Sequence, residues 1–423
     1  MRPVLNHDSL AAVAAARRDP EYAVPLYDGY GFASVPRLIR ALLTGDADTG
    51  VPAAALGDLP RRADNLVLFL VDGFGWSFFD RFADLPFLAR FLADGVASKI
   101  TSQFPATTAA HMTTLHTGAP SAESGVFEWF YHEPLLGQIF APLLAVTVGP
   151  ERTIPVREDR LAALYPATTL YEQLAAAGVR CRLYQSAQYA RSPYSKAVTR
   201  GAEPCAYRTL PELMVNLAEA VRTSEGKAYH CVYIDVVDHL SHAYGPAAPQ
   251  LAAEIRSLFG QLEQFFLPGI AGARQPPTLL LAADHGQTAV DPARTIYLDQ
   301  LLPGSPRWLR TTSDGRPLRP AGSPRDVFLY VRDEHLLEAE QALAAALAGR
   351  AAVHRTRALL DAGVFGPNPS PRLVDRAGDL VILPHAHEMV WWWDAARFAL
   401  DKRGHHGGLG PEELETPLLA LAL

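Results

Sequence analysis

The chain has 423 residues, of which 49% are hydrophobic and 20% charged; its 38 lysines and arginines against 45 aspartates and glutamates give a formal charge of −7. This length predicts one large α/β unit with an insertion, or two to three domains. The acidic balance excludes a protein that binds nucleic acid polymers by broad neutralisation of phosphates, but it leaves room for a local basic pocket.

The cysteines and the apolar segments indicate a reducing compartment. Cys181, Cys205 and Cys231 are odd in number and form no C-x-x-C pair, so neither a disulfide framework nor a cysteine zinc site is indicated. The first residues lack the apolar run of a signal peptide, and no window of about 18 uncharged apolar residues exists that would span a membrane. We therefore expect a cytoplasmic protein without a membrane partner, and the oligomeric state stays open.

The first predicted strand, Asn65–Val71, is a continuous apolar run that ends at Asp72. Strands that are covered on both faces consist of consecutive apolar residues, whereas in strands exposed on one face apolar and polar residues alternate. In open α/β sheets the ligand crevice lies at the carboxyl ends of the strands. Asp72 is therefore a candidate functional residue.

A hydroxyl-rich stretch, residues 104–118, predicts a loop that enters a helix ending near Gly118. A threonine at the start of such a helix meets free backbone N–H groups and the positive end of the helix dipole, which favour an alkoxide and bind phosphate oxygens. Threonine at a helix start is more often only an N-cap. The stretch alone favours the N-cap interpretation.

Two further helices are predicted over residues 167–178 and 211–223. The first has apolar residues at helical spacing and stops at Gly178, and the second begins with proline. The alternation of strands and helices predicts an α/β fold, with a doubly wound, mostly parallel sheet flanked by helices.

A second apolar run, residues 230–237, is followed by Asp238. His242 lies four residues after Asp238, so both side chains reach one metal ion if the chain turns helically there. A lone pair with this spacing is usually a surface pair of Asp and His. The position directly after a buried strand favours the metal interpretation.

The third and most apolar run, residues 278–283, is followed by Asp284 and His285. Burying an unpaired carboxylate is costly, so a cation partner is expected there. Because all three apolar runs end at an aspartate, we expect the three carboxylates to meet at one edge of the sheet.

Residues 300–399 differ from the rest of the chain because proline- and glycine-rich connectors surround short elements. We predict a strand over 327–331, a helix over 334–348 and a strand over 379–383. These elements indicate a small α+β cap inserted into a catalytic core that comprises residues 1–299 and 400–423.

Near the C-terminus the sequence RGHHGG supplies His405 and His406 between glycines that allow close approach of the backbone. Three carboxylates, three or four imidazoles and a hydroxyl are enough to hold two divalent ions. Mixed His/Asp ligation without thiolate suits Zn²⁺ first and Mn²⁺ second. Two such ions about 3.5–4 Å apart clamp the attacking and leaving oxygens of a phosphoryl displacement.

These motifs resemble the alkaline phosphatase superfamily, and within it the type I phosphodiesterase/nucleotide pyrophosphatase family, from LVLFLVDG at 66–73 to GHHGG at 404–408. The resemblance implies Thr108 as nucleophile, with Thr107 as the alternative. It also implies His406 as the last metal ligand, with His405 as the alternative.

The resemblance further implies how the ligands are shared. One metal ion would lie on Asp238, His242 and His406, and the other on Asp72, Thr108, Asp284 and His285. Thr108 would attack phosphorus and form a phospho- or nucleotidyl-threonine, which water would then hydrolyse. Two displacements at phosphorus imply overall retention.

Several positions depart from the family pattern. The aromatic residue expected after the nucleophile is Ala109, the phosphate-binding asparagine aligns near Trp129, and the usual His-Gly is Ser124-Gly125. Trp129 and Tyr131 are candidates for the wall of a different substrate pocket. Packing under the cap is the equally weighted alternative for both.

Other residues are weaker candidates. Three cap arginines could contact a distal phosphate, although a solvated surface role is favoured for each: Arg325, Arg372 and Arg376. We expect residues 391–393 (WWW) to form a packing element or pocket wall, and His385 and His387 to lie in a polar loop and not in a third metal site.

The sequence therefore predicts a two-metal phosphoesterase that hydrolyses a small phosphodiester or pyrophosphate, with a nucleotide as one possible substrate. The alternatives are a phosphomonoesterase or phosphonate hydrolase on the same scaffold, and a catalytically silent metal-dependent binding protein. A sulfatase is excluded because its nucleophile position requires Cys or Ser.

Overall fold

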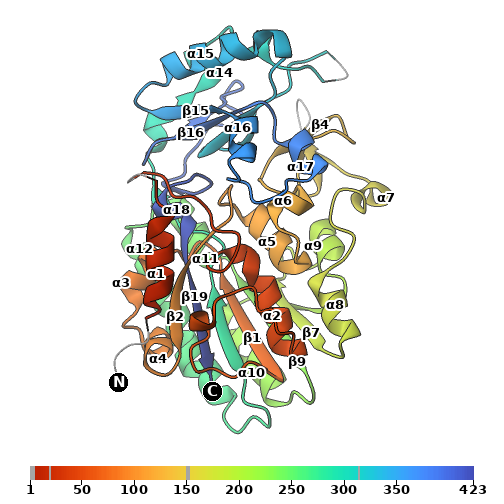
Figure 1. Ribbon diagram of the computed structural model, residues 1–423, viewed down its shortest axis with the longest axis vertical. Coiled ribbons are helices and arrows are strands. Elements are labelled where there is room, and N and C mark those ends of the chain that lie inside the picture. The colour runs from red at the N-terminus through yellow and green to blue at the C-terminus, as the bar shows by residue number, and fades with distance from the viewer. Residues whose placement is uncertain (1–4, 19–20, 149–152, 313–314) are drawn as a thin grey trace.

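The computed structural model describes residues 5–18, 21–148, 153–312 and 315–423, and its centre is a seven-stranded sheet in the order β2-β19-β10-β1-β9-β7-β8 (Figure 1). The strands are β1 (Asn65–Val71), β2 (Val96–Thr101), β7 (Arg180–Ser186), β8 (Ala202–Tyr207), β9 (Ala228–Ile234), β10 (Thr278–Ala282) and β19 (Glu415–Ala422). All neighbouring pairs are parallel except the two made by β19, which lies antiparallel to β10 and β2. The predicted mostly parallel α/β sheet is confirmed.

Strand β1 shows why helices cover both faces of this sheet. Leu66, Leu68 and Leu70 lie in one hydrophobic core, whereas the residues between them lie in the opposite core, because successive side chains of a strand point to opposite faces. The first core includes residues of α2 (Val35–Thr44), α5 (Thr108–Thr117) and α8 (Leu170–Ala176). The second includes residues of α3 (Trp76–Phe82), α4 (Pro86–Asp94), α10 (Leu210–Arg222) and α12 (Pro249–Gln261). The sheet is therefore doubly wound, as predicted.

The two predicted helices, residues 167–178 and 211–223, are present as α8 and α10. Helix α8 begins later than predicted because Thr169 is its N-cap: Thr169 Oγ1 accepts from the N–H of Glu172, and the Glu172 carboxylate accepts from the N–H of Thr169. None of the helices in the described ranges is long and apolar enough to cross a membrane.

The prediction that a strand runs directly to Asp238 is wrong. Strand β9 ends at Ile234, and Asp238 lies in the first turn of α11 (Val236–Tyr244). Val237, which continued the apolar run, is fully buried in the core as part of the helix. An apolar run does not by itself distinguish a strand from the buried face of a helix.

A second, antiparallel sheet lies above the carboxyl end of the main sheet in Figure 1 and has the order β13-β14-β16-β15. It comprises β13 (Ala321–Ser323), β14 (Asp326–Leu329), β15 (Ala351–Arg355) and β16 (Leu380–Pro384), and α15 (Leu336–Ala346) shares a hydrophobic core with it. The two strands and the helix predicted in this part of the chain are confirmed within a few residues. We propose that residues 300–399 form a cap domain.

Shorter elements connect the two sheets. A sheet that the sequence did not predict comprises β3 (Tyr131–Glu133), β4 (Gln138–Ala141), β5 (Val146–Val148) and β6 (Thr153–Pro155). Strand β11 (Thr288–Ala289) pairs with β18 (Gly404–His405), and β12 (Ile296–Tyr297) pairs with β17 (Val390–Trp391). Short helices complete this region: α6 (Ser121–Ser124), α17 (Pro371–Arg376) and α18 (Pro411–Leu414).

Candidate active site and metal centre

The carboxyl edge of the main sheet brings together the seven residues predicted as nucleophile and metal ligands. Asp72 follows β1, Asp284 lies two residues after the end of β10, and α5 begins at Thr108. Helix α11 carries Asp238 and His242, and His406 follows β18. Segments from distant parts of the chain therefore meet where parallel α/β sheets place their ligands.

His285 is at the centre of the first group, with its Nε2 3.3 Å from Asp72 Oδ1, 3.4 Å from Asp284 Oδ2 and 3.2 Å from Thr108 Oγ1. Asp72 Oδ1 and Asp284 Oδ2 are buried and accept no hydrogen bond from the described residues. Burial raises the pKa of Asp72 well above its usual range, and the charges of Asp284 and Asp238 raise it further. Paired carboxylates of this kind are stabilised by a cation.

A second group is built around Asp238, whose Oδ1 lies 3.3 Å from His242 Nε2 and 3.5 Å from His406 Nε2. The ring of His406 stacks on that of His285, with centroids 3.5 Å apart. The ligand atoms of Asp238, His285 and His406 lie within 4.8 Å of one another, as do those of Asp72, Asp284 and His285. The two groups therefore adjoin, which suits two neighbouring ions.

The backbone orients three imidazoles in the same way. Nδ1 of His285, His242 and His406 lies 3.0, 2.7 and 2.8 Å from the carbonyl oxygens of Gly286, Gly404 and Ala106, respectively. A carbonyl accepts only, so each Nδ1 carries the proton and each Nε2 has a free lone pair directed into the site. His405 Nδ1 lies 2.9 Å from both the backbone nitrogen and the carbonyl oxygen of His406, and His405 belongs to neither group.

The donor set fits divalent metal ions. It consists of buried oxygens of Asp72 and Asp284 that accept no hydrogen bond from the described residues, the Asp238 carboxylate and imidazole Nε2 atoms, which four segments bring into two adjoining groups. Oxygen and nitrogen ligands without thiolate are the set that borderline divalent cations prefer.

The start of α5 distinguishes between the two candidate nucleophiles. Thr107 occupies the N-cap position without capping, because its hydroxyl donates to the carbonyl oxygen of Phe127 at 3.1 Å. Thr108 is the first helical residue, and its hydroxyl faces His285. His111 accepts from the N–H of Gln103 at 2.8 Å and donates to the carbonyl of Thr107 at 2.7 Å, which fixes the loop before the helix. The geometry favours Thr108 beside the free N–H groups of the helix.

Two residues that sequence reasoning missed hold the carboxylates in place. The Tyr233 hydroxyl donates to Asp72 Oδ2, and the Gln287 side-chain amide donates to Asp238 Oδ1. Tyr233 was hidden inside an apolar run. Gln287 directly follows the Asp-His-Gly motif, so proximity to that motif was the signal that could have found it.

Replacing Tyr233 by Phe should weaken metal binding by about 10- to 100-fold, because Asp72 loses the donor that orients it. Competition with a chromophoric chelator measures the affinity. Tyr189→Phe is the matched control, since Tyr189 donates at 2.8 Å to Asp235, a carboxylate outside both ligand groups. Equal losses in the two variants would contradict a specific role for Tyr233.

A cavity of about 460 Å³ opens over the two groups and is lined by Thr108, Asp238, His242, His406, Trp129, Phe130, Trp391, Phe398 and Lys402, among others. Trp129, a predicted pocket residue, is 39% exposed and contributes to this wall. Tyr131 does not, since it is fully buried, stacks on Phe127 and lies under the Arg376 guanidinium. For Tyr131 the packing alternative is therefore the one that the structure supports.

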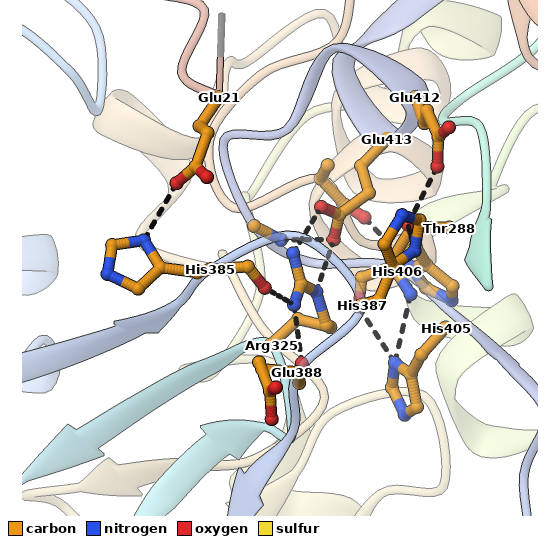
Figure 2. Close-up of polar contacts among 12 residues, drawn as sticks. Glu21, Thr288, Arg325, His385, His387, Glu388, His405, His406, Glu412 and Glu413 are labelled. Carbon is orange, nitrogen blue, oxygen red and sulfur yellow. Dashed lines mark hydrogen bonds and ion pairs between the residues drawn. The ribbon is translucent and has the colours of Figure 1, made fainter. Parts of the chain in front are cut away.

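Two of the three cap arginines are neither surface residues nor substrate ligands. Arg325 forms a buried bidentate pair with Glu413 of α18, at 3.0 and 2.8 Å, and donates to the carbonyl of His385 at 2.8 Å (Figure 2). Arg376 of α17 forms a buried pair with Glu133 and donates to the carbonyl of Gly125 at 2.8 Å. Only Arg372 is exposed as predicted. The first pair joins the turn between β13 and β14 to α18, and the second joins α17 to β3.

Arg376→Ala should lower the free energy of unfolding by about 3–5 kcal/mol, because it leaves the Glu133 carboxylate buried without a cation. Arg372→Ala, on the same helix α17, is the control and should change it by no more than about 0.5 kcal/mol. Urea unfolding of both variants measures the difference. An equally small effect of Arg376→Ala would show that the pair adds no net stability.

One comparison with known proteins identifies a family. Residues 66–408, well over half of the chain, match the family model described as type I phosphodiesterase / nucleotide pyrophosphatase. No curated protein sequence matches the chain.

Solved structures of ectonucleotide pyrophosphatase / phosphodiesterase 5 share the fold. An inactive threonine-to-alanine variant of the murine protein in complex with AMP has a TM-score of 0.62 and 16% identity, covering 84% of this chain and 87% of that one. The human protein gives the same values, and a second murine structure differs only in covering 88% of that chain. The family match and the shared fold show that this chain belongs to the type I phosphodiesterase / nucleotide pyrophosphatase family and is a hydrolase of that class.

Proposed function

We propose that the chain hydrolyses a phosphodiester or pyrophosphate bond in a small phosphorylated substrate, with Thr108 as nucleophile. The observation that carries this proposal is the Thr108 hydroxyl at the free N-terminus of α5, 3.2 Å from His285 Nε2. The proposed ligands of two divalent ions are Asp72, Thr108, Asp238, His242, Asp284, His285 and His406. Zinc is the first candidate for both ions and manganese the second, because the ligands are carboxylates and imidazoles without thiolate.

When bound, the ions would lower the pKa of the attacking hydroxyl and neutralise charge on the phosphoryl oxygens. The chain itself positions the Thr108 hydroxyl and the phosphoryl group for the reaction. The hydroxyl oxygen of Thr108 loses its proton and forms a bond to phosphorus, while the bond from phosphorus to the leaving-group oxygen breaks and that oxygen takes up a proton. Water then bonds to phosphorus, the bond to Thr108 breaks, and the Thr108 oxygen regains a proton. Backbone N–H groups at the start of α5 face the phosphoryl oxygens during both steps.

The cavity supports a substrate with a planar aromatic group, and nucleotides are the first class to test. Trp129, Phe130, Trp391 and Phe398 supply aromatic surface next to Thr108. The murine relative in the solved structure binds AMP. Since the position after the nucleophile is the buried Ala109, the aromatic contact would come from the Trp129 side of the cavity instead.

Trp129→Ala should raise KM for an aryl phosphodiester by about 10-fold and change kcat less, because aromatic contacts contribute about 0.5–1.5 kcal/mol beyond area burial. Steady-state kinetics separate the two constants. Phe265→Ala is the control, because Phe265 has a similar exposure, 40% against 39%, and does not line this cavity. An unchanged KM for Trp129→Ala would place the substrate elsewhere.

The proposed function is tested with metal-free protein that is resupplied with Zn²⁺ or Mn²⁺ and assayed on an aryl phosphodiester and the matched aryl phosphomonoester. A diester preference at about two bound ions per chain supports the proposal. A monoester preference would move the chain to the phosphatase alternative. Failure to cleave either substrate, or any of a set of nucleotides and phosphonates, would overturn it.

A further inference from the structure

Two carboxyl groups that the proposed chemistry does not use meet beside the cavity. Glu128 lies in the loop after α6, and Asp326 is the first residue of β14, so the upper sheet faces the loop here. Both side chains are fully buried, and each carboxyl group perturbs the pKa of the other.

Each carboxyl group has one oxygen that is already occupied by a donor. One oxygen of Glu128, Oε2, accepts from the N–H of Trp129, and Asp326 Oδ1 accepts from the Ser323 hydroxyl. The other two oxygens, Glu128 Oε1 and Asp326 Oδ2, receive no N–H or O–H from the described residues. These are the atoms between which a proton would be shared.

The arginine next to Asp326 in the chain is engaged by other groups. The adjacent Arg325 is committed to Glu413 and to the carbonyls of His385 and Glu388 (Figure 2), and Glu413 adds negative charge near Asp326. On the cavity side the charged or titratable neighbours are Lys402, Arg397, Asp238, His239, His242, His405 and His406. Two adjacent buried carboxylates would repel each other, whereas one proton turns the repulsion into a hydrogen bond.

The pair lies against the segment that carries the last proposed metal ligand. A Cβ atom on Gly407 would stand 2.7 Å from Asp326 Oδ1 and 2.6 Å from Ser323 Oγ, so this contact requires glycine. Ser323 Oγ also lies 3.4 Å from the carbonyl oxygen of His406. The carbonyl of Gly407 in turn accepts from the N–H of Ala106, two residues before Thr108, at 3.1 Å.

We propose that Glu128 and Asp326 share one proton. This shared proton forms a clamp that holds the loop carrying Trp129 and the β13–β14 hairpin against residues 406–407. Glu128 is thereby a positioning residue for His406 and Thr108. This inference rests on the proposed hydrolysis by Thr108. Burial raises the pKa of Glu128 to about 8, and burial together with the charge of Glu128 raises that of Asp326 well above its usual range. The proton is therefore held at neutral pH.

The test compares Glu128→Gln with Glu128→Ala. The Gln side chain reproduces the protonated carboxyl group: its amide donates to Asp326 and its oxygen accepts from the N–H of Trp129. We expect Glu128→Ala to lower kcat by about 10-fold or more, as supporting residues of metal ligands do, and Glu128→Gln to recover most of that loss. Activity of the parent protein should fall as pH rises through about 8, and the fall should move to higher pH in Glu128→Gln.

A second variant and a control complete the comparison. Asp326→Asn should also retain the clamp, with Glu128 then ionised and accepting from the new amide. Glu123→Gln should leave the pH profile unchanged, because Glu123 is an exposed carboxyl five residues earlier in the same segment. The proposal would be overturned if Glu128→Gln and Glu128→Ala lost kcat equally. It would also be overturned if the activity of the parent and of Glu128→Gln fell at the same alkaline pH. A third metal ion that is lost in Glu128→Gln would overturn it as well.

Thermal unfolding tests the clamp without reference to hydrolysis. A carboxyl whose pKa is higher in the folded protein contributes stability at low pH that is lost as pH rises through the folded pKa. Between pH 7 and 9, Tm of the parent should therefore fall by about 2 °C or more relative to Glu128→Gln. If the parent hydrolyses nothing but shows this difference, the proposed function fails and the shared proton stands. If the difference is absent, the shared proton itself is refuted.

Discussion

Thr108→Ala is expected to lower kcat for an aryl phosphodiester on the order of 10³-fold or more, because it removes the proposed nucleophile. The remaining ligands still converge on the two groups, so bound metal per chain should stay nearly unchanged. Rapid kinetics on the metal-loaded protein and metal analysis of the same sample measure the two quantities together. A loss of activity with retained metal separates the role of Thr108 in attack from any role in assembling the site.

Two neighbouring variants make this result specific. Thr108→Ser keeps a hydroxyl at the same position and should retain measurable hydrolysis. Thr107→Ala removes only a hydroxyl that donates to the carbonyl of Phe127, which costs about 1 kcal/mol of stability, and should keep most of the activity. If Thr107→Ala were inactive and Thr108→Ala active, the nucleophile would be Thr107.

The sheet was predictable because its central strands are buried on both faces. In β1 all seven residues are buried, and such a strand reads as one apolar run without a polar face. The same property caused the error at β9, where the run continued into α11. Hydrophobic burial alone carries no information on where a strand ends and a helix begins, so Asp238 was assigned to the wrong element although its place at the sheet edge was right.

The ligand residues were found through motifs that are local in sequence, whereas their supporting contacts are not. Arg376 and Glu133 are 243 residues apart, and Arg325 and Glu413 are 88 residues apart. Nothing in either segment indicates its partner, so solvated roles were assigned to arginines that are buried. The cap boundaries and the cytoplasmic location stay predictions.

Removing the divalent ions with a chelator should abolish hydrolysis and lower Tm, and the loss of Tm should grow as pH rises above the ordinary aspartate pKa of about 4. In the metal-free protein, burial raises the pKa values of Asp72 and Asp284. Their contribution to folding stability is therefore present at low pH and is lost as pH rises through the folded pKa values. Bound ions replace the missing protons, and saturation at about 100 times Kd adds about 2.7 kcal/mol.

The histidines act in the opposite direction but at lower pH. Burial lowers the pKa values of His242 and His406, so their contribution is complete above the ordinary histidine pKa of about 6.5 and is lost below it. Above about pH 6.5 the histidines no longer change the stability, so Asp72 and Asp284 determine how the effect of metal removal depends on pH. Asp72→Asn removes one of them and should reduce the slope of Tm against pH in the metal-free protein. A difference in Tm between loaded and metal-free protein that stays constant over this range would show that Asp72 and Asp284 do not hold the ions.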